Sequence, residues 1–303
     1  MWLPVAIPPR AMSINTRRGH LTSEGPVPER SRPMTTTDYS RFDRPEILQV
    51  LFHPRPEFGG LFGGSATTGL DILIPVQAGI AVGARFHLTS PDGANILFFH
   101  GNGEIVADYD EVGPLYNRLG LNFLPVDYRG YGRSGGQPSV AAMMQDCHTI
   151  LAFVTAWLAE HNYRGPLVLM GRSLGSASVL ELAATHPEEI DGLIIESGFA
   201  LAGPLLQLLG FDPQALGFTE EAGFNHLAKI RTWQKPLLII HAQYDHIIPY
   251  TEAQALYAAC SSPDKTLVQI PGANHNDLFL VGWQQYLAEI AKFIGKIKKG
   301  GQS

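Results

Sequence analysis

The sequence has little of what marks secreted, membrane-spanning or disulfide-rich proteins. Only two cysteines, Cys147 and Cys260, occur among its 303 residues, and they lie far apart without the spacing of a metal site. Two distant cysteines make no disulfide framework, so the composition favours a reducing compartment and a cytoplasmic protein. No apolar run approaches the roughly 18 residues that a membrane-spanning helix needs, so we expect no transmembrane segment.

Positive charge is also scarce. The chain carries 22 Lys and Arg residues against 28 Asp and Glu residues, which gives a formal net charge of −6. A nucleic-acid-binding surface needs a basic face, so this balance argues against a nucleic-acid partner. The glycine-rich stretches "HGNGE" and "GYGRSGG" do not end in the G-K-[ST] of a phosphate-binding loop. We therefore expect no cofactor.

The first 33 residues differ in composition from the rest of the chain. They hold five arginines, six prolines and only two acidic residues, Glu24 and Glu29. Such a composition can bury little apolar surface, so we expect residues 1–40 to be disordered and residues 41–300 to form a single domain. A transit peptide and an upstream start codon, with the true start at Met34, are the alternative interpretations.

From about Leu70 onward, short apolar runs alternate with helical patterns. The runs "LDILIPV" and "IAVGARFHL" are separated by a Gln-Ala-Gly turn and predict a β-hairpin. After the apolar run "ILFFHG", runs such as "LNFLPVDY", "PLVLMG" and "KPLLIIHA" each precede a stretch with helical periodicity. Nearly continuous apolar strands between helices are typical of a buried parallel sheet with helices on both faces. We therefore predict an α/β fold with a mostly parallel, twisted sheet of about eight strands.

One connection is much longer than the others. Residues 198–233 contain the apolar helical piece "ALAGPLLQLLGF", followed by the glycine-punctuated "GFTEEAGF". A long connection inside a compact sheet fold is usually functional, so we interpret it as a small cap over the carboxyl ends of the strands. The alternative is a peripheral helical excursion that only covers an edge.

The stretch "MGRSLGS" places Ser173 between Gly171 and Gly175 in a G-x-S-x-G pattern. An apolar run precedes it and a helical pattern follows it, which is the context of a sharp strand-to-helix turn that projects the serine oxygen. A serine hydroxyl is a weak nucleophile until a base removes its proton. Ser173 therefore needs a histidine and, behind it, a carboxylate.

Two residues further along the chain can supply these partners. Asp245 ends the strand run "KPLLIIHAQYD", and His275 lies in the loop "PGANHND" after the last strand run. The order Ser…Asp…His is that of hydrolases with a nucleophile elbow. The carboxyl ends of parallel strands bring such residues together at one edge of the sheet.

Other side chains could take these positions. Glu196 ends the preceding strand and is a rival acid, and Asp245 could instead cap the following helix. His246 is adjacent to Asp245, which makes a facing hydrogen bond awkward, whereas His241 ends a buried strand and is more typical of a core histidine. A zinc site built from these histidines with Asp277 has no H-E-x-x-H pair and leaves the serine unexplained, so we expect no metal.

A tetrahedral oxyanion would need preorganised N–H donors. The backbone amide of Leu174, directly after the serine, is one candidate. Asn102, in the "HGNG" stretch after the first parallel strand, lies in the loop that would supply the second. The alternative for Asn102 is a capping asparagine in a glycine turn.

Five blocks of the sequence together resemble the α/β-hydrolase superfamily. They are "HGNGE", "DYRGYGRSGG", "GRSLGS", the D-x-I-I-P from Asp245 to Pro249, and "NHND". They look most similar to the Bem46-like branch, relatives of the serine aminopeptidase and monoacylglycerol-lipase-type hydrolases, over residues 70–298. The resemblance implies an α/β-hydrolase fold and assigns roles to five residues: Ser173 as nucleophile, Asp245 as acid, His275 as base, and Asn102 and Leu174 as oxyanion donors.

The hypothesis from the sequence is therefore a serine hydrolase of the carboxylesterase kind (EC 3.1.1). It would cleave a small-molecule carboxylic ester or thioester through an acyl-enzyme, without a metal or cofactor. The apolar cap stretch favours a hydrophobic acyl pocket and a medium-chain or lysolipid-like substrate. A peptidase or amidase, or an acyltransferase, would use the same residues, and a non-catalytic binding protein could keep the same fold.

Overall fold

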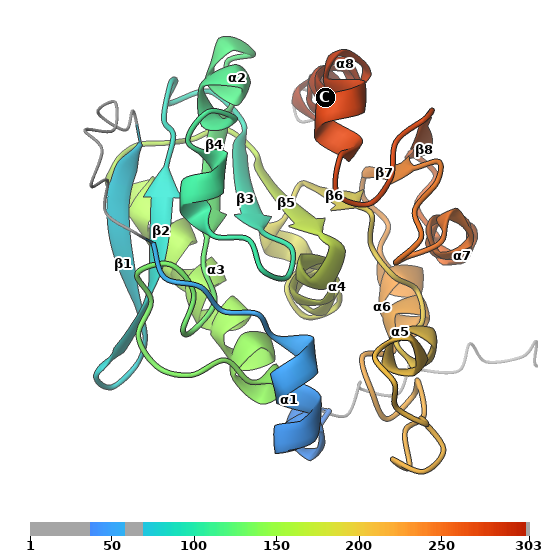
Figure 1. The fold of residues 1–303 in the computed structure, drawn as a ribbon. Coiled ribbons are helices and arrows are strands. Elements are labelled where there is room, and N and C mark those ends of the chain that lie inside the picture. Colours follow the sequence, from blue (N-terminus) through green and yellow to red (C-terminus); the bar gives the residue numbers. More distant parts are fainter. Residues whose placement is uncertain (1–36, 58–68, 301–303) are drawn as a thin grey trace, which may run out of the picture. The chain divides into compact units, whose positions relative to one another are not determined.

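The computed structural model describes residues 37–57 and 69–300, which are arranged around one sheet (Figure 1). The strand order is β1-β2-β4-β3-β5-β6-β7-β8. β1 and β2 form an antiparallel hairpin, β2 pairs antiparallel with β4, and β3 to β8 run parallel to one another. The strands are β1 (Leu70–Gln77), β2 (Ile80–Phe86), β3 (Asn95–Phe99), β4 (Asn122–Val126), β5 (Leu167–Arg172), β6 (Gly192–Glu196), β7 (Leu237–Ala242) and β8 (Lys265–Ile270). The predicted mostly parallel sheet of eight strands is confirmed.

Helices cover both faces of the sheet. The helices are α1 (Pro45–Leu51), α2 (Gly113–Arg118), α3 (Val140–Glu160), α4 (Ser176–Thr185), α5 (Gly203–Leu208), α6 (His226–Thr232), α7 (Tyr250–Ala259) and α8 (Leu278–Gly300). Short 3-10 turns are η1 (Tyr39–Phe42), η2 (Val106–Tyr109), η3 (Ser173–Gly175) and η4 (Pro187–Glu189). α2 and α8 pack on one face of the sheet, and α3, α4, α6 and α7 pack on the other.

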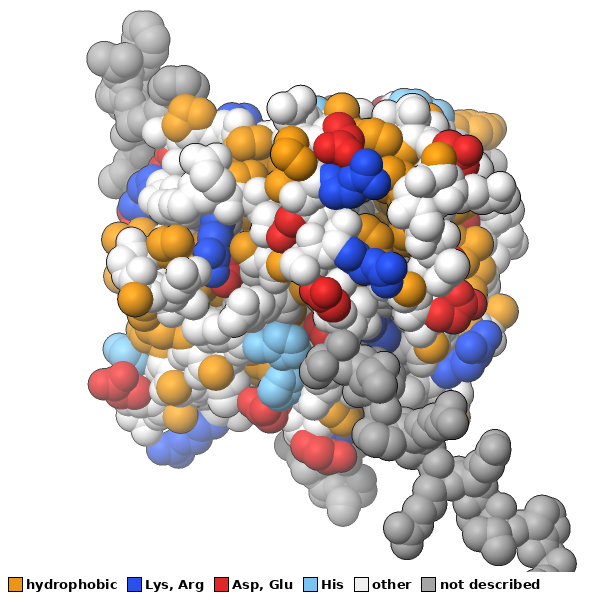
Figure 2. Space-filling model, turned by 90° about the horizontal axis from the view of Figure 1, so that it is seen from below, with side chains coloured by type: hydrophobic (Ala, Val, Ile, Leu, Met, Phe, Trp, Pro, Cys, Tyr) orange, Lys and Arg blue, Asp and Glu red, His pale blue; other side chains and the backbone are white. Residues whose placement is uncertain are grey.

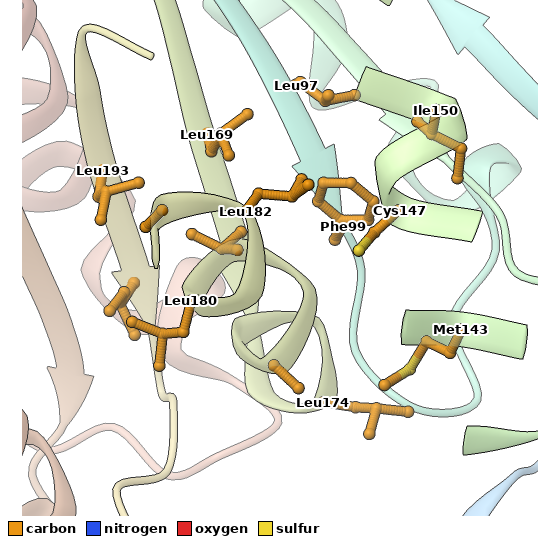
Figure 3. Packing of buried hydrophobic residues seen from close by; sticks show 14 of the residues in the cluster. Leu97, Phe99, Met143, Cys147, Ile150, Leu169, Leu174, Leu180, Leu182 and Leu193 are labelled. Atoms are coloured by element: carbon orange, nitrogen blue, oxygen red, sulfur yellow. The ribbon is translucent and has the colours of Figure 1, made fainter. Parts of the chain in front are cut away.

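The alternation of side chains along the strands gives each face its own core. Leu97 and Phe99 of β3 belong to the cluster with α3 and α4, whereas Ile96 and Phe98 belong to the cluster with α2 and α8. Figure 3 shows the first cluster, in which Cys147 of α3 lies beside Phe99. Because the central strands are buried on both sides, they read in the sequence as continuous apolar runs.

The N-terminal segment that the structure describes, residues 37–57, packs against the helical layer. The Asp43 carboxylate accepts hydrogen bonds from the amides of Val140 and Ala141 at 2.7 and 3.2 Å, and thereby caps the start of α3. Tyr39 is buried and donates to Glu181 of α4 at 2.8 Å. Of the segment expected to be disordered, residues 1–36 lie outside the described residues.

The long connection after β6 divides into two parts. α5 and the turns that follow it reach as far as residue 225, whereas α6 packs against α4 and α7 as part of the helical layer. The cap over residues 198–233 stays a prediction, and within that range α6 belongs to the helical layer. Among the described residues, none of the helices combines the length and apolar character that crossing a membrane requires.

Candidate active site

Ser173 stands at the turn between β5 and α4, in a strained backbone conformation. Its φ is +50°, in the left-handed region that residues with a Cβ seldom adopt. The flanking glycines allow this turn: a Cβ on Gly171 would lie 2.5 Å from the carbonyl oxygen of Gly175, and one on Gly175 would lie 2.1 Å from that of Phe99. The G-x-S-x-G spacing therefore reflects close backbone approach on both sides of the serine.

His275 comes to Ser173 from the loop between β8 and α8. Its Nε2 lies 3.0 Å from the Ser173 hydroxyl oxygen, and its Nδ1 lies 2.6 Å from Oδ2 of Asp245. The loop is braced by Asp277, whose carboxylate accepts hydrogen bonds from the amide and the side chain of Asn274 at 2.7 and 2.6 Å. The structure thus brings together the three residues that the sequence placed in the order Ser…Asp…His.

Asp245 is buried and held as a carboxylate at the end of β7. Its Oδ1 accepts the amides of Ile247 and Ile248 at 3.0 and 2.7 Å, which leaves Oδ2 for the histidine. Burial alone would raise the pKa of Asp245, but hydrogen bonds from His241, His275 and the backbone outweigh it and lower the pKa well below its usual range. A negative Asp245 can orient the His275 ring and stabilise its cationic form.

The rival residues do not contact Ser173. Glu196 accepts hydrogen bonds from Arg172 at 2.7 Å and from the Tyr286 hydroxyl at 2.6 Å, on the other side of the strand. His241 is buried, with Nε2 2.7 Å from the carbonyl oxygen of Ile248 and 3.4 Å from Oδ2 of Asp245, and His246 is exposed. Within residues 37–57 and 69–300, the His, Cys, Asp and Glu side chains form no group of three that could hold a metal ion.

Asn102, Ser173 and Leu174 line one pocket, as an oxyanion site would require. The side chain of Asn102 makes the contacts expected from the capping alternative. It donates to the Leu51 carbonyl at 2.6 Å and accepts from the His53 amide at 3.0 Å, while the Tyr131 hydroxyl donates to it at 2.8 Å. The side chain of Asn102 therefore connects the end of α1 to this loop. These contacts use only side-chain atoms, so they do not involve the backbone amide of Asn102.

The pocket beside Ser173 is almost entirely apolar and has a volume of about 170 Å³. One wall comes from the connection between β6 and α6, with Leu205, Leu206 and Phe218, and another from Ile247 and Ile248 after β7. Figure 2 looks onto the side of the molecule where α1 and α5 lie in Figure 1, and on its coloured part hydrophobic side chains are interspersed with both charges.

The third wall was missed in the sequence analysis. Phe42, Ile47, Val50 and Leu51, from η1 and α1, line the same pocket. Two signals pointed to this helix: a proline at its first position and apolar residues spaced by three and four. The sequence analysis assigned no helix to residues 41–57, so it predicted no such wall.

Comparisons with known proteins bear on the family and the fold of the chain. The family model described as serine aminopeptidase, S33 matches residues 90–211 and 221–279. The chain is 28% identical over 243 residues to the α/β-hydrolase domain-containing protein WAV2 of Arabidopsis thaliana, which covers 75% of this chain and 78% of that protein.

Two solved structures are similar in fold. An esterase of Pyrococcus furiosus superimposes with a TM-score of 0.63 at 17% identity, covering 81% of this chain and 97% of the esterase. A monoacylglycerol lipase of Paleococcus ferrophilus gives a TM-score of 0.55 at 19% identity, covering 71% and 99%.

Proposed function

The chain belongs to the S33 serine aminopeptidase family of α/β-hydrolases, and from that premise we propose that it is a serine hydrolase that cleaves a carboxylic ester or thioester. The observation that carries the proposal is the continuous hydrogen-bonded series from Asp245 through His275 to Ser173, with Ser173 opening onto an apolar pocket.

The reaction follows from the positions of these atoms. His275 Nε2 accepts the Ser173 proton as the serine oxygen attacks the acyl carbonyl, and Asp245 stabilises the imidazolium that forms. The amides of Asn102 and Leu174 would bind the oxyanion. His275 then gives its proton to the leaving group, and in the second half it activates the water that releases the acid and restores Ser173.

The apolar pocket supports an acyl chain as the group bound beside Ser173. A cavity of about 150 Å³ in another protein holds one benzene ring, so this pocket suits a chain of about six to eight carbons. A peptide amine would need an acidic partner, and the side chains of residues 37–57 and 69–300 that line the pocket include none. The esterase and monoacylglycerol lipase among the similar structures act on esters by name, which agrees with this substrate class.

The test is active-site labelling followed by a substrate series. A fluorophosphonate should label the wild type and not Ser173→Ala, and p-nitrophenyl esters should give the highest kcat/KM at about six to eight carbons. Equal labelling of both proteins would contradict the proposal. Faster cleavage of aminoacyl-nitroanilides would favour a peptidase, and acyl transfer to an added alcohol in preference to water would favour an acyltransferase.

A further inference from the structure

A cluster of charged side chains lies behind the strand that carries Ser173, on the face of the sheet that α2 and α8 cover. Arg172, the residue before Ser173, is buried there and pairs in register with Glu196 of β6. Its Nε donates to Oε1 of Glu104 and its Nη1 to Oε1 of Glu196, each at 2.7 Å. The guanidinium is therefore held between two carboxylates.

The same cluster reaches the backbone of both loops that approach Ser173. Arg172 Nη2 donates to the carbonyl oxygen of His275 at 3.0 Å. Oε2 of Glu104 accepts the amide of Gly101 at 2.7 Å, and Gly101 directly precedes Asn102. One guanidinium thus joins the strand of the nucleophile to the loop of the base and, through Glu104, to the loop of the proposed oxyanion donor.

We propose that Arg172 and Glu104 are positioning residues that keep the Asn102 and His275 loops in register with Ser173. The inference rests on the proposed hydrolase mechanism and adds two residues that do not touch the reacting atoms. Arginine suits this position because its planar guanidinium presents several donors in fixed directions, whereas a lysine ammonium is a single point charge.

The surroundings keep the cluster ionised and rigid. Burial would raise the pKa of Glu104, but the charge and hydrogen bond of Arg172 outweigh it, so the pKa is lowered. The hydroxyls of Tyr109 and Tyr286 donate to the outer oxygens of Glu104 and Glu196 at 2.7 and 2.6 Å. These contacts satisfy the carboxylates and hold them in place.

The expected effect falls on the rate of the chemical step. A displacement of about 1 Å between reacting groups can cost on the order of a hundredfold in rate. The acyl pocket is lined by other residues, so substrate affinity should change little. Positioning therefore predicts a fall in kcat per folded molecule with a nearly constant KM. Loss of folded protein also lowers the apparent kcat at constant KM, so rates are expressed per folded molecule, and the labelling rate constant, which does not depend on the amount of folded enzyme, is compared as well.

The first test measures the rate constant for fluorophosphonate labelling of Ser173, together with kcat and KM for a p-nitrophenyl ester. For Arg172→Met we expect labelling and kcat to fall about 30- to 100-fold, with KM within about threefold of the wild type. Glu104→Gln, which keeps its shape but loses its charge, should fall about tenfold in kcat. The Glu104→Gln variant still tests the proposal if Arg172→Met does not fold.

Arg85 provides the matched control. It is a second buried arginine, on β2, and it binds the carboxylates of Asp71, Asp110 and Glu57 at 2.7 to 2.9 Å without contacting either loop. Arg85→Met removes a comparable ion cluster, so it should lower the thermal midpoint while kcat per folded molecule stays within about threefold.

A chemical rescue uses the space around Arg172. Arg172, Glu104 and Glu196 line a cavity of about 240 Å³ on the α2 and α8 side, through which a small ion can reach the cluster. Added guanidinium should restore labelling of Arg172→Ala by about tenfold, and sodium at equal ionic strength should not.

The outcomes separate this inference from the proposed function. A wild type that the fluorophosphonate does not label overturns the hydrolase proposal and this inference with it. A labelled wild type with Arg172→Met and Glu104→Gln within about threefold of it overturns the positioning role alone. Equal loss of kcat per folded molecule in Arg85→Met would overturn it as well.

Discussion

Single residues in this site contact several residues that lie far from them in the chain. Asn102 fastens α1 through its side chain and is proposed to bind the oxyanion through its backbone amide. Arg172 touches Glu104, Glu196 and the His275 carbonyl from a position next to the nucleophile. Geometry at Ser173 therefore depends on side chains that would look merely structural in the sequence.

The role of the Asp245 charge can be tested by a single substitution. Asp245→Asn keeps the size of the side chain but places an amide where His275 needs an acceptor, so the imidazole is left in the wrong tautomer. We expect kcat to fall by about 10³- to 10⁴-fold, measured by ester hydrolysis at neutral pH.

The adjacent His246 supplies the control for that substitution. It is exposed, and His246→Gln should leave kcat within about twofold of the wild type. A loss of less than about tenfold in Asp245→Asn would mean that another group orients His275.

Among the helices and strands, the strands were predictable, whereas the wall of the pocket formed by η1 and α1 was not. The buried strands β3, β5, β6 and β7 appear in the sequence as continuous apolar runs, because both of their faces are covered. Ser173, Asp245 and His275 follow β5, β7 and β8, and because these strands run parallel, the three residues meet at one edge of the sheet.

The N-terminal wall of the pocket depends on contacts that no local pattern contains. α1 is a seven-residue helix, too short to be stable by itself. It is held by Asp43 at the start of α3 and by Asn102 after β3, about 50 to 100 positions away. The cluster of Arg172 and Glu104 was not predicted either. Each residue lies in a motif in which the neighbouring residues were assigned the roles, and the contact between the two joins separate parts of the chain.

The wall formed by α1 can be tested by filling the pocket. Val50 lines the pocket beside Ser173, so Val50→Trp should shorten the preferred acyl chain by about two to four carbons. The measurement is kcat/KM across the series of p-nitrophenyl esters. Gln49→Trp on the exposed side of the same helix should leave the preference unchanged, and an equal shift in both variants would exclude a specific role for this wall.

At the scale of the whole molecule, a buried charge cluster ties the N-terminal segment to the helical layer. Lys229 of α6 contacts Glu181 of α4 at 2.6 Å and donates to the Tyr39 hydroxyl at 2.8 Å. Burial would raise the pKa of Glu181, but hydrogen bonds and the Lys229 charge lower it to about 2. The Glu181 carboxylate is thus charged at neutral pH, and its contribution to stability is lost as the pH falls below about 4.5.

His226 lies at the start of α6 beside this cluster and makes the stability depend on pH above about 4.5. Its Nδ1 lies 2.8 Å from the Phe199 carbonyl oxygen, and burial, followed by the charge of Lys229, lowers its pKa to about 3. In the unfolded chain a histidine titrates near 6.5, so between about pH 6.5 and 3 the unfolded state binds more protons. The contribution of neutral His226 is therefore complete above about pH 6.5 and declines as the pH falls.

The wild type should accordingly lose about 2 kcal/mol of unfolding free energy from this residue between pH 7 and pH 5. In His226→Asn, whose amide can still donate to the Phe199 carbonyl, that loss disappears and the pH profile flattens by the same amount. Urea unfolding at both pH values measures the difference, and His161→Asn at an exposed position serves as the control. Parallel profiles for the wild type and His226→Asn would show that His226 does not carry this dependence, since all other titrating groups are common to both proteins.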